Sequence, residues 1–455
     1  MSFPAYASHK DSVIEELASI PSDWQEGPFK AIASCNDEVL DESFPAEQLV
    51  KYVEISDVSL AEGIKSAQEM SFEQAPSRAR RIVRQGDVLV STVRTYLKAI
   101  AYVDRDEPNL VASTGFAVIR ARNACPKFLG YVAQSEYFIA RVIAASVGVS
   151  YPAVNASEIM RLPVAFPDLE TQGKIAAFLD GETAKIDRLI AAQRKLIDLL
   201  DEKKQSLISH AVTKGLNPDV PTKESGVQWL GDVPENWQVR SIKSLATGSG
   251  TLFTDGDWIE SKNLSTDGIR YITTGNVGQG AYKEQGSGYI SESTFEELNC
   301  TEVLPGDVLV SRLNQPIGRA CLAPNLGGRV ATSVDNVIFR PAPEFDPAFV
   351  VYRFSASDYL HELNLLASGT TMQRVSRTEL GGVRIAWPPH SEQLQIVGFL
   401  DRITKQIDIL TKKTQLSIDL LKERRSALIS AAVTGKIDVR GLVQAPQEQQ
   451  ARESA

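Results

Sequence analysis

Two stretches of the chain carry apolar residues at spacings of three and four positions, the pattern of a helix with one apolar stripe. They cover residues 175–207 and 396–428, and neither contains a proline. We therefore predict two long helices, over residues 169–214 and 390–437. Because a lone helix cannot bury so narrow a stripe, we expect the two to form an antiparallel, coiled-coil-like pair. The alternative is that each helix packs on its own globular part.

The two helices belong to an internal repeat that covers nearly the whole chain. The hexapeptide GDVLVS at residues 86–91 recurs unchanged at 306–311, and segment 199–213 returns at 420–434 with nine of its fifteen residues identical. The helical segments keep one offset of 221 residues, so the insertions cluster in the globular parts. This division indicates constant scaffolds that carry two different faces. The alternative is a neutral duplication in which both halves do the same job.

The globular parts carry short apolar runs typical of strands in a mixed α/β domain. One run at residues 88–90 returns at 308–310, and a second at 116–119 returns at 337–339. We expect two globular α/β domains separated by two long antiparallel helices, as a pseudo-two-fold tandem repeat. The predicted boundaries are 1–168 for the first globular domain, 169–214 for the first helix, 215–230 for a linker, 231–389 for the second globular domain, 390–437 for the second helix and 438–455 for a disordered polar tail.

The composition of the 455 residues narrows the classes of function. The net charge is −9 and the pI about 5.3, which argues against a uniformly basic nucleic-acid coat but not against a local basic patch. The four cysteines have no paired spacing and the four histidines no ligand spacing, so we expect reduced thiols and no metal site. With no long apolar run and no basic-then-apolar N-terminus, the chain is expected to be cytoplasmic and without a membrane partner.

A local basic cluster follows an acidic first stretch of the chain. Residues 78–98 contain five arginines and Lys98 against one acidic residue, Asp87. Such a cluster can hold phosphates, and the alternative is a solvated charged surface. After the shared strand the first copy reads STVRTYLKA and the second SRLNQPIGR. Because arginine reads guanine and asparagine or glutamine reads adenine, two copies with different polar faces would read two different sequences.

Motifs for catalysis are incomplete wherever the sequence approaches one. The segment Trp-Pro-Pro-His at 387–390 lacks the Asn or Asp that opens an adenine methyltransferase motif. Gly435-Lys436 is not followed by the Ser or Thr that a P-loop requires. The spacing Glu202-x-Lys204 suits a nuclease, but it lies inside a predicted helix, where a surface charge pair explains it better. We therefore predict no catalytic residue in this chain.

Many motifs, in one order and twice over, resemble the specificity (S) subunit of type I restriction–modification enzymes. In the first copy they are residues 86–98, 146–152, 178–187 and 207–216, and in the second 255–262, 274–277, 334–337, 369–374 and 388–393. The likeness covers the chain from about residue 20 to about residue 437. One departure is visible, because the second copy approaches its helix with Pro-Pro and Glu392, where the first has Pro-Asp and Thr171.

The resemblance implies that each globular part is a target recognition domain for one half of a bipartite site in double-stranded DNA. It implies that the helices set the spacer and dock two methyltransferase (M) subunits, which restriction (R) subunits join. S-adenosylmethionine, ATP and Mg would bind those partners, and no cofactor would bind this chain. The chain would be the non-catalytic part of an adenine-N6 DNA methyltransferase and site-specific deoxyribonuclease, near the nucleoid of a bacterium or archaeon. The alternative is an orphan or degenerate scaffold that joins partners without reading DNA.

The side chains expected to contact DNA are polar, basic or aromatic and lie in or near these motifs. In the first copy they are Arg78, Arg80, Arg81, Arg94, Thr95, Tyr96, Lys98, Ser150 and Tyr151. In the second copy they are Asp257, Trp258, Lys262, Thr274, Asn276, Arg312, Asn314, Gln315, Arg319 and Arg374. The apolar positions expected in the helix pair and in subunit docking are Ile186, Leu189, Leu200, Leu207, Ile407, Leu410, Leu421 and Leu428.

Overall fold

The computed structural model describes residues 3–285, 288–369 and 372–442, and the chain divides into two units. Unit 1 comprises Met1–Arg194 with Leu416–Ala455, and unit 2 comprises Lys195–Gln415. Both are mixed α/β, and each contains one part of each long helix, as the tandem repeat predicts. Within the described ranges, no helix combines the length and apolarity that crossing a membrane requires.

A four-stranded sheet of order β11-β10-β13-β4 positions the site of unit 1. Its strand β10 (Val88–Ser91) is buried along its whole length, which explains its unbroken apolar run. It pairs antiparallel with β11 (Ile100–Tyr102) and β13 (Phe116–Ala121), and β4 (Ala33–Cys35) closes the edge. A second sheet has the order β8-β5-β12-β9, with β5 Leu49–Val53, β8 Gln68–Ser71, β9 Ala79–Ile82 and β12 Leu110–Ser113.

Smaller strand pairs and short α-helices accompany these two sheets in unit 1. The strand pairs are β1 His9–Asp11 with β2 Ser19–Pro21, β3 Gln25–Pro28 with β14 Pro163–Phe166, and β6 Val58–Ser59 with β7 Gly63–Ile64. The helices are α1 Pro126–Gln134, α2 Glu136–Ala144 and α3 Ala156–Ile159.

Unit 2 repeats this plan, which confirms that both apolar runs form strands in both copies; the structure adds that the two strands pair with each other. Its strand β22 (Val308–Ser311) is buried throughout and pairs antiparallel with β23 (Ala320–Leu322) and β25 (Asn336–Arg340), with β18 (Leu252–Asp255) at the edge. The second sheet, β19-β21-β20-β24, contains β19 Leu264–Ser265, β20 Ile269–Ile272, β21 Gly288–Ile290 and β24 Val330–Thr332. The remaining elements are β15 Thr222–Glu224, β16 Asp232–Pro234, β17 Gln238–Ser241, α5 Glu292–Glu297, α6 Pro347–Phe354, α7 Ser357–Leu366, α8 Arg377–Gly382 and β26 Arg384–Trp387.

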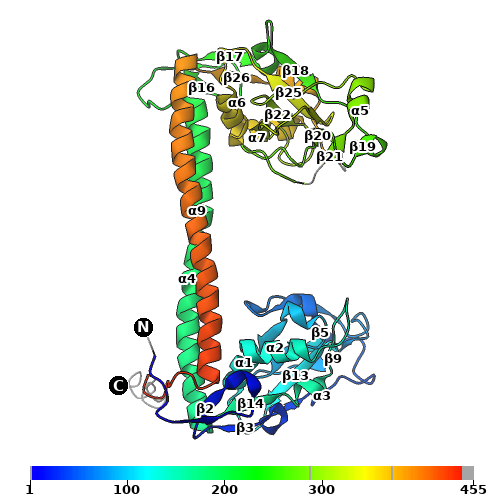
Figure 1. The fold of residues 1–455 in the computed structure, drawn as a ribbon, viewed down its shortest axis with the longest axis vertical. Helices are drawn as coiled ribbons and strands as arrows, with labels where there is room; N and C mark the ends of the chain where they lie inside the picture. The colour runs from blue at the N-terminus through cyan, green and yellow to red at the C-terminus, as the bar shows by residue number, and fades with distance from the viewer. Residues whose placement is uncertain (1–2, 286–287, 370–371, 443–455) are drawn as a thin grey trace. The chain divides into compact units, whose positions relative to one another are not determined.

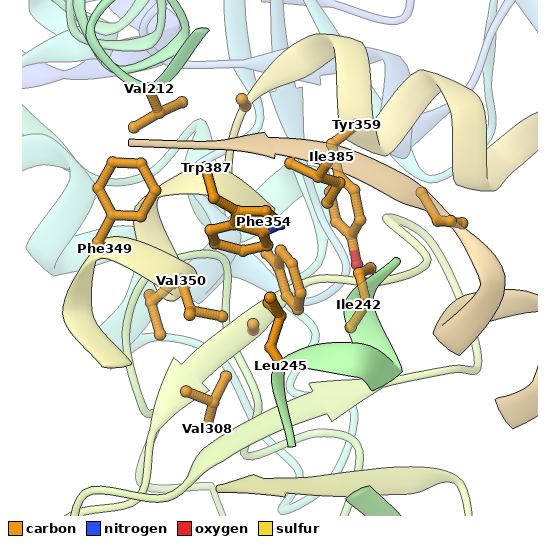
Figure 2. Close-up of a cluster of buried hydrophobic side chains, with 14 of the residues drawn as sticks. Val212, Ile242, Leu245, Val308, Phe349, Val350, Phe354, Tyr359, Ile385 and Trp387 are labelled. Atoms are coloured by element: carbon orange, nitrogen blue, oxygen red, sulfur yellow. The ribbon is translucent and has the colours of Figure 1, made fainter. Parts of the chain in front are cut away.

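The core of unit 2 joins strands, short helices and a long helix. Figure 2 shows Trp387 from β26, Phe349 from α6 and Val212 of the first long helix around a common centre. Burying each such side chain stabilises the fold by about 1.5–3 kcal/mol. Because Val212 is part of this core, the core also fixes the helix to unit 2. In unit 1 the repeat-related Val433 of the second long helix is likewise fully buried.

The long helices are α4 (Leu169–Lys214) and α9 (His390–Val433), which lie side by side within each unit (Figure 1). The first part of α4 shares unit 1 with the last part of α9, and the reverse holds in unit 2, so the pair is antiparallel as predicted. Repeat-related ion pairs tie them, Asp187 with Arg425 at 3.1 Å and Asp408 with Lys204 at 2.6 Å. The second helix ends before the predicted residue 437 because Gly435 takes φ 73°, the left-handed conformation that closes a helix.

Two predicted segments differ in detail from the structure. The predicted linker, 215–230, contains β15, which pairs with β16 in the same way as β1 pairs with β2 in unit 1. This segment therefore belongs to the second repeat. In the predicted tail, Val439 is fully buried and the Arg440 guanidinium lies 4.5 Å from the Tyr6 ring centre, so the start of the tail packs on unit 1. Residues 443–455 of that prediction lie outside the described residues.

The departure at the start of the first helix has a structural explanation. Asp168 caps α4: its carboxylate accepts hydrogen bonds from the backbone N–H of Thr171 at 2.9 Å and from the Thr171 hydroxyl at 3.0 Å. The hydrogen bond from the Thr171 backbone lowers the pKa of Asp168. Unit 1 thus begins α4 with a side-chain cap where unit 2 begins α9 after two prolines.

Replacing Asp168 with alanine should lower the free energy of unfolding by about 1 kcal/mol at neutral pH. Because the folded-state pKa of Asp168 is lowered, this contribution is fully present above an ordinary aspartate pKa of about 4 and is lost as the pH falls through the lowered value. Denaturant unfolding of the two proteins at several pH values measures the difference. Glu170→Ala, which removes a neighbouring exposed carboxylate, is the control, and an equal loss in that variant would contradict the capping role.

Candidate nucleic-acid interface

Two loops of unit 1 meet at the end of the buried strand β10. The first contains Arg94 and Lys98, both with left-handed backbone, on either side of a short 3-10 turn, Thr95–Leu97. The Arg94 backbone N–H donates a hydrogen bond to the Pro152 carbonyl at 2.7 Å. A β-bridge between Val93 and Ala153 continues the contact. Segments 92–98 and 146–153, which the sequence separates by about fifty residues, therefore form one surface, the unit 1 loop pair.

This loop pair displays several of the predicted DNA-contacting side chains together. Arg94, Tyr96, Lys98, Ser150 and Tyr151 are all exposed. The Arg94 guanidinium lies 4.6 Å from the Tyr151 ring centre, a cation–π contact that orients it. The surface thus combines two cations with exposed aromatic rings, a composition suited to phosphates and base edges.

Thr95 is a correction to the predicted set. Its side chain is buried, and its hydroxyl lies 2.7 Å from the Ser146 hydroxyl on the other loop. Because its hydroxyl is buried and hydrogen-bonded to Ser146, Thr95 holds the two loops together and is not exposed for a contact with DNA. The repeat alone could not reveal this, since nothing in the sequence distinguishes Thr95 from its neighbours Arg94 and Tyr96, which are exposed.

Three of the arginines before β10, Arg78, Arg80 and Arg81, are predicted DNA contacts, but each also contacts other parts of unit 1 or is half-buried. Arg78 forms an ion pair with Glu54 and donates to the Tyr52 hydroxyl at 3.1 Å. Arg80 lies over the Phe72 ring at 4.9 Å, and Arg81 is half-buried in β9. Arg78 is nevertheless linked to the loop pair through backbone hydrogen bonds. Its carbonyl accepts from the Thr114 N–H, and the next residue, Gly115, accepts from the N–H of Thr92 in the first loop. It stays a predicted contact.

Unit 2 builds a loop pair from repeat-related positions. Asn314 takes the left-handed backbone of Arg94, and its N–H donates to the Gln373 carbonyl at 3.4 Å, as Arg94 does to Pro152. The β-bridges also recur, with Leu313 and Ser368 both paired to Arg374. Segments 312–318, 368–369 and 372–374 therefore form the unit 2 loop pair, and residues 370–371 lie outside the described residues. Asn314, Gln315 and Arg374 are exposed on it.

Arg319 and Arg312 are further corrections, because the structure buries both. The Arg319 side chain is 8% exposed and donates hydrogen bonds at 2.7–3.2 Å to the backbone carbonyls of Thr274, Val277, Leu313, Asn314 and Pro316. Arg312 donates to the carbonyls of Val334 and Val375 at 2.7 and 3.0 Å, and its Nε lies 3.1 Å from Asp255. Burial lowers the pKa of both guanidinium groups. These arginines hold the loops in place from below and offer no donor to DNA.

The predicted contacts between residues 257 and 276 of unit 2 also include both buried and exposed side chains. Asn276 is buried and joins the backbone at residues 273, 283 and 285 through its amide, so its predicted contact with DNA is corrected to a structural role. Thr274 is half-buried, and its carbonyl accepts from Arg319. Asp257 accepts from the Thr301 N–H, and burial raises its pKa. Trp258 and Lys262 are exposed, and both contact Glu260.

Residues outside the predicted set also shape the unit 2 loop pair. The Gln315 amide nitrogen donates to side-chain oxygens of Asn364 and of Gln373, the latter at 3.0 Å. Arg377 lies 3.6 Å from Asp255, and Arg374 lies 3.5 Å from Asp335. The repeat held a signal for Gln373, because it occupies the position of Pro152, but no local signal marked Asn364, which lies on α7.

The predicted helix-pair positions fall into three groups. Ile186, Ile407 and Leu428 are buried, and Leu200, Leu207 and Leu421 are half-buried. Leu189 and Leu410 do not lie in the pair's core, since they are 51% and 50% exposed. The apolar stripe is wider than one antiparallel partner covers, because an extra leucine recurs at the same position of both copies.

The family model of the type I restriction modification DNA specificity domain matches residues 52–198 and 234–418. The chain is similar to the putative type I restriction enzyme MjaX specificity subunit of Methanocaldococcus jannaschii, with 23% identity over 443 residues, 93% of this chain and 96% of that protein. It is 30% identical over 172 residues, 36% of each chain, to the type I restriction enzyme HindI specificity subunit of Haemophilus influenzae.

Solved structures share the fold. A chain from work on complex assembly and conformational transition of the type I R-M system matches with a TM-score of 0.70 and 24% identity, over 91% of this chain and 99% of that one. The HsdS subunit from Thermoanaerobacter tengcongensis matches with a TM-score of 0.52 and 23% identity, over 91% of this chain and 98% of that one. At these identities the likeness shows a common architecture.

Proposed function

Because the chain belongs to the type I restriction modification DNA specificity family, whose domain matches it twice, we propose that it is the DNA-specificity subunit of a type I restriction–modification complex. Each unit reads one half of a bipartite site with its loop pair. One observation carries this: the two loop pairs have the same backbone anchors and different exposed side chains. A scaffold that joined partners without reading DNA would have no use for two unlike faces on one frame.

Selection from random double-stranded DNA tests this function. The chain is mixed with its methyltransferase partner, and bound DNA is recovered and sequenced. The expected result is two blocks of specified bases separated by a fixed number of unspecified ones. The same selection with the partner alone sets the background. If the complex enriched no split motif above that background, the DNA-reading function would be rejected in favour of the scaffold.

We also propose that two methyltransferase subunits dock on repeat-related leucines of the long helices. Unit 1 exposes Leu189 and Leu420, and unit 2 exposes their counterparts Leu410 and Leu199, each at least half exposed. Exposed apolar side chains that gather in one patch mark protein contacts, and here the same two leucines stay exposed in both copies. Two equivalent patches fit two copies of one partner. S-adenosylmethionine, ATP and Mg would then be bound by the partner subunits.

Replacing Leu189 and Leu420 together with aspartate should reduce the bound methyltransferase subunits from two to one. Binding would bury the new aspartate carboxylates against an apolar surface of the partner, and removing a charge from water is costly. The affinity of that patch for the methyltransferase subunit should therefore fall more than tenfold. Native mass spectrometry of the mixed subunits measures the ratio. The matched variant with Leu410 and Leu199 replaced should lose the other copy, and all four changes should lose both. Full occupancy in the fourfold variant would contradict this docking site.

We further propose that α4 and α9 set the number of unread base pairs between the half-sites, because both helices run unbroken from one unit into the other. Deleting the repeat-related residues 192–198 and 413–419 keeps the helical phase within about 20° and shortens each helix by about 10 Å. At about 3.4 Å per base pair, the unread gap should shrink by about three base pairs. Sequencing of selected DNA measures the gap. An unchanged gap with both half-sites retained would contradict the proposal.

A further inference from the structure

We propose that one repeated backbone position, Arg94 in unit 1 and Asn314 in unit 2, contacts a base in each half-site, with Arg94 reading a guanine and Asn314 an adenine. This inference rests on the proposed function that each unit reads one half-site. The two residues have nearly the same left-handed backbone, with φ 51° and 61°. Each follows its buried strand at the same distance, within the same loop.

The surroundings hold this position in both units. A residue other than glycine occupies the left-handed region at an energetic cost, and such conformations persist where neighbouring structure fixes them. The neighbour here is the second loop, whose repeat-related residues Pro152 and Gln373 accept the N–H of Arg94 and Asn314. In unit 2 the buried Arg319 also binds the Asn314 carbonyl at 2.8 Å. The backbone is thus prepared before any ligand arrives.

The Arg94 guanidinium is oriented yet available. It lies over the Tyr151 ring, and within the described part of the chain no carboxylate pairs with it and no acceptor takes a hydrogen bond from its side chain. By contrast, Arg78, Arg84 and Arg120 of the same unit are ion-paired. A planar, unpaired guanidinium matches the two acceptors, O6 and N7, that guanine presents in the major groove.

The other polar side chains near Asn314 cannot read the adenine, because they are already hydrogen-bonded or buried. Gln315 uses its amide nitrogen on Asn364 and Gln373, so it has no N–H left for adenine N7. Arg312 and Arg319 are buried. Asn314 is exposed, and among the described residues its side-chain amide has no hydrogen-bond partner. It therefore offers the donor and the acceptor that adenine N7 and N6 require.

The other predicted contacts of the unit 1 loop suit other roles. Thr95 is spent on Ser146. Lys98 carries a compact charge without a directional fork, which favours phosphate over a base edge. At the position of Arg94 and Asn314 the two loop pairs therefore present different base-reading side chains on one kind of backbone.

Exchanging the two residues provides the test, because each is already accommodated on the same backbone in its own unit. Arg94→Asn and Asn314→Arg are made separately in the full chain, and each is assembled with the methyltransferase partner for selection from random DNA. We expect Asn314→Arg to change one position of one half-site from adenine to guanine by about tenfold or more, and the other half-site to stay the same. Arg94→Asn should make the opposite change in the other half-site.

Two further variants make the result decisive. Asn123→Arg places the same charge on another exposed left-handed asparagine, at the end of β13 away from the loop pair, and should leave both half-sites unchanged. Asn314→Asp is nearly isosteric and removes the amide donors, so it should abolish the adenine preference even if Asn314→Arg fails to fold. Unaltered base preferences in folded Arg94→Asn and Asn314→Asp would overturn the inference while leaving the proposed function intact. Absence of any split motif with the wild-type chain would overturn both.

Discussion

Replacing Arg319 with methionine is expected to lower the free energy of unfolding by about 3 kcal/mol or more and to abolish sequence reading by unit 2. The guanidinium is buried and binds five backbone carbonyls from two segments, residues 274–277 and 313–316. Each carbonyl that is left buried without a hydrogen-bond donor costs about 1–3 kcal/mol. Water molecules that enter the space left by the guanidinium would offset part of this cost by donating to some of the carbonyls. The loop that carries Asn314 would lose its support. Calorimetric unfolding and DNA selection measure the two effects.

Arg319→Lys and unit 1 are the controls for this prediction. Lysine keeps the charge, but its ammonium has three donors and lacks the planar fork with which the guanidinium reaches five carbonyls. Arg319→Lys should therefore recover only part of the stability and little of the sequence reading by unit 2. Unit 1 has Ala99 at the equivalent position and holds its loops through Thr95 and Ser146, so its half-site should be unaffected. Loss of both half-sites to the same extent would show that the change acts on the whole chain and not on one loop.

Exchanging residues 29–162 with the corresponding segment of another specificity subunit is expected to replace one half-site completely and to leave the other unchanged. The segment lies between the paired strands β3 and β14, so the cuts leave this ribbon and both long helices in place. The donor segment has to keep the contacts with the helices, such as the Tyr131 hydroxyl with Asp180 at 2.8 Å, which recurs as Tyr352 with Asp401 at 2.7 Å. Methylation mapping in a host that carries the complex reads both half-sites.

The matched exchange in unit 2, over residues 242–383 between β17 and β26, should change only the second half-site. Unfolding measurements on both hybrids exclude simple loss of structure. A change in both half-sites after either exchange would refute the independence of the two units. Retention of the original motif in both hybrids would place the reading residues outside the loop pairs.

Much of the fold followed from patterns that are local in the sequence. The spacing of apolar residues identified α4 and α9, and the repeated GDVLVS identified β10 and β22. These elements could be predicted because helix and strand periodicity is written directly in the order of apolar and polar residues. The site was harder to predict from sequence, because neighbouring polar residues of one loop differ in burial: some are exposed and others are buried.

Sequence by itself determined the tandem repeat, the two long helices, the matching strands of both copies and the likeness to DNA specificity subunits, because each depends on the order and spacing of residues along the chain. Only the tertiary structure decided which polar groups are free to meet DNA. Arg94 and Asn314 are exposed, and no hydrogen-bond acceptor or carboxylate among the described residues takes their side chains, whereas Arg319, Thr95 and Asn276 are buried and hydrogen-bonded inside the protein. The acceptors that bury Arg319 include carbonyls more than forty residues away in the chain. The exposure of a charged side chain depends on such distant partners, and the order of residues does not specify them.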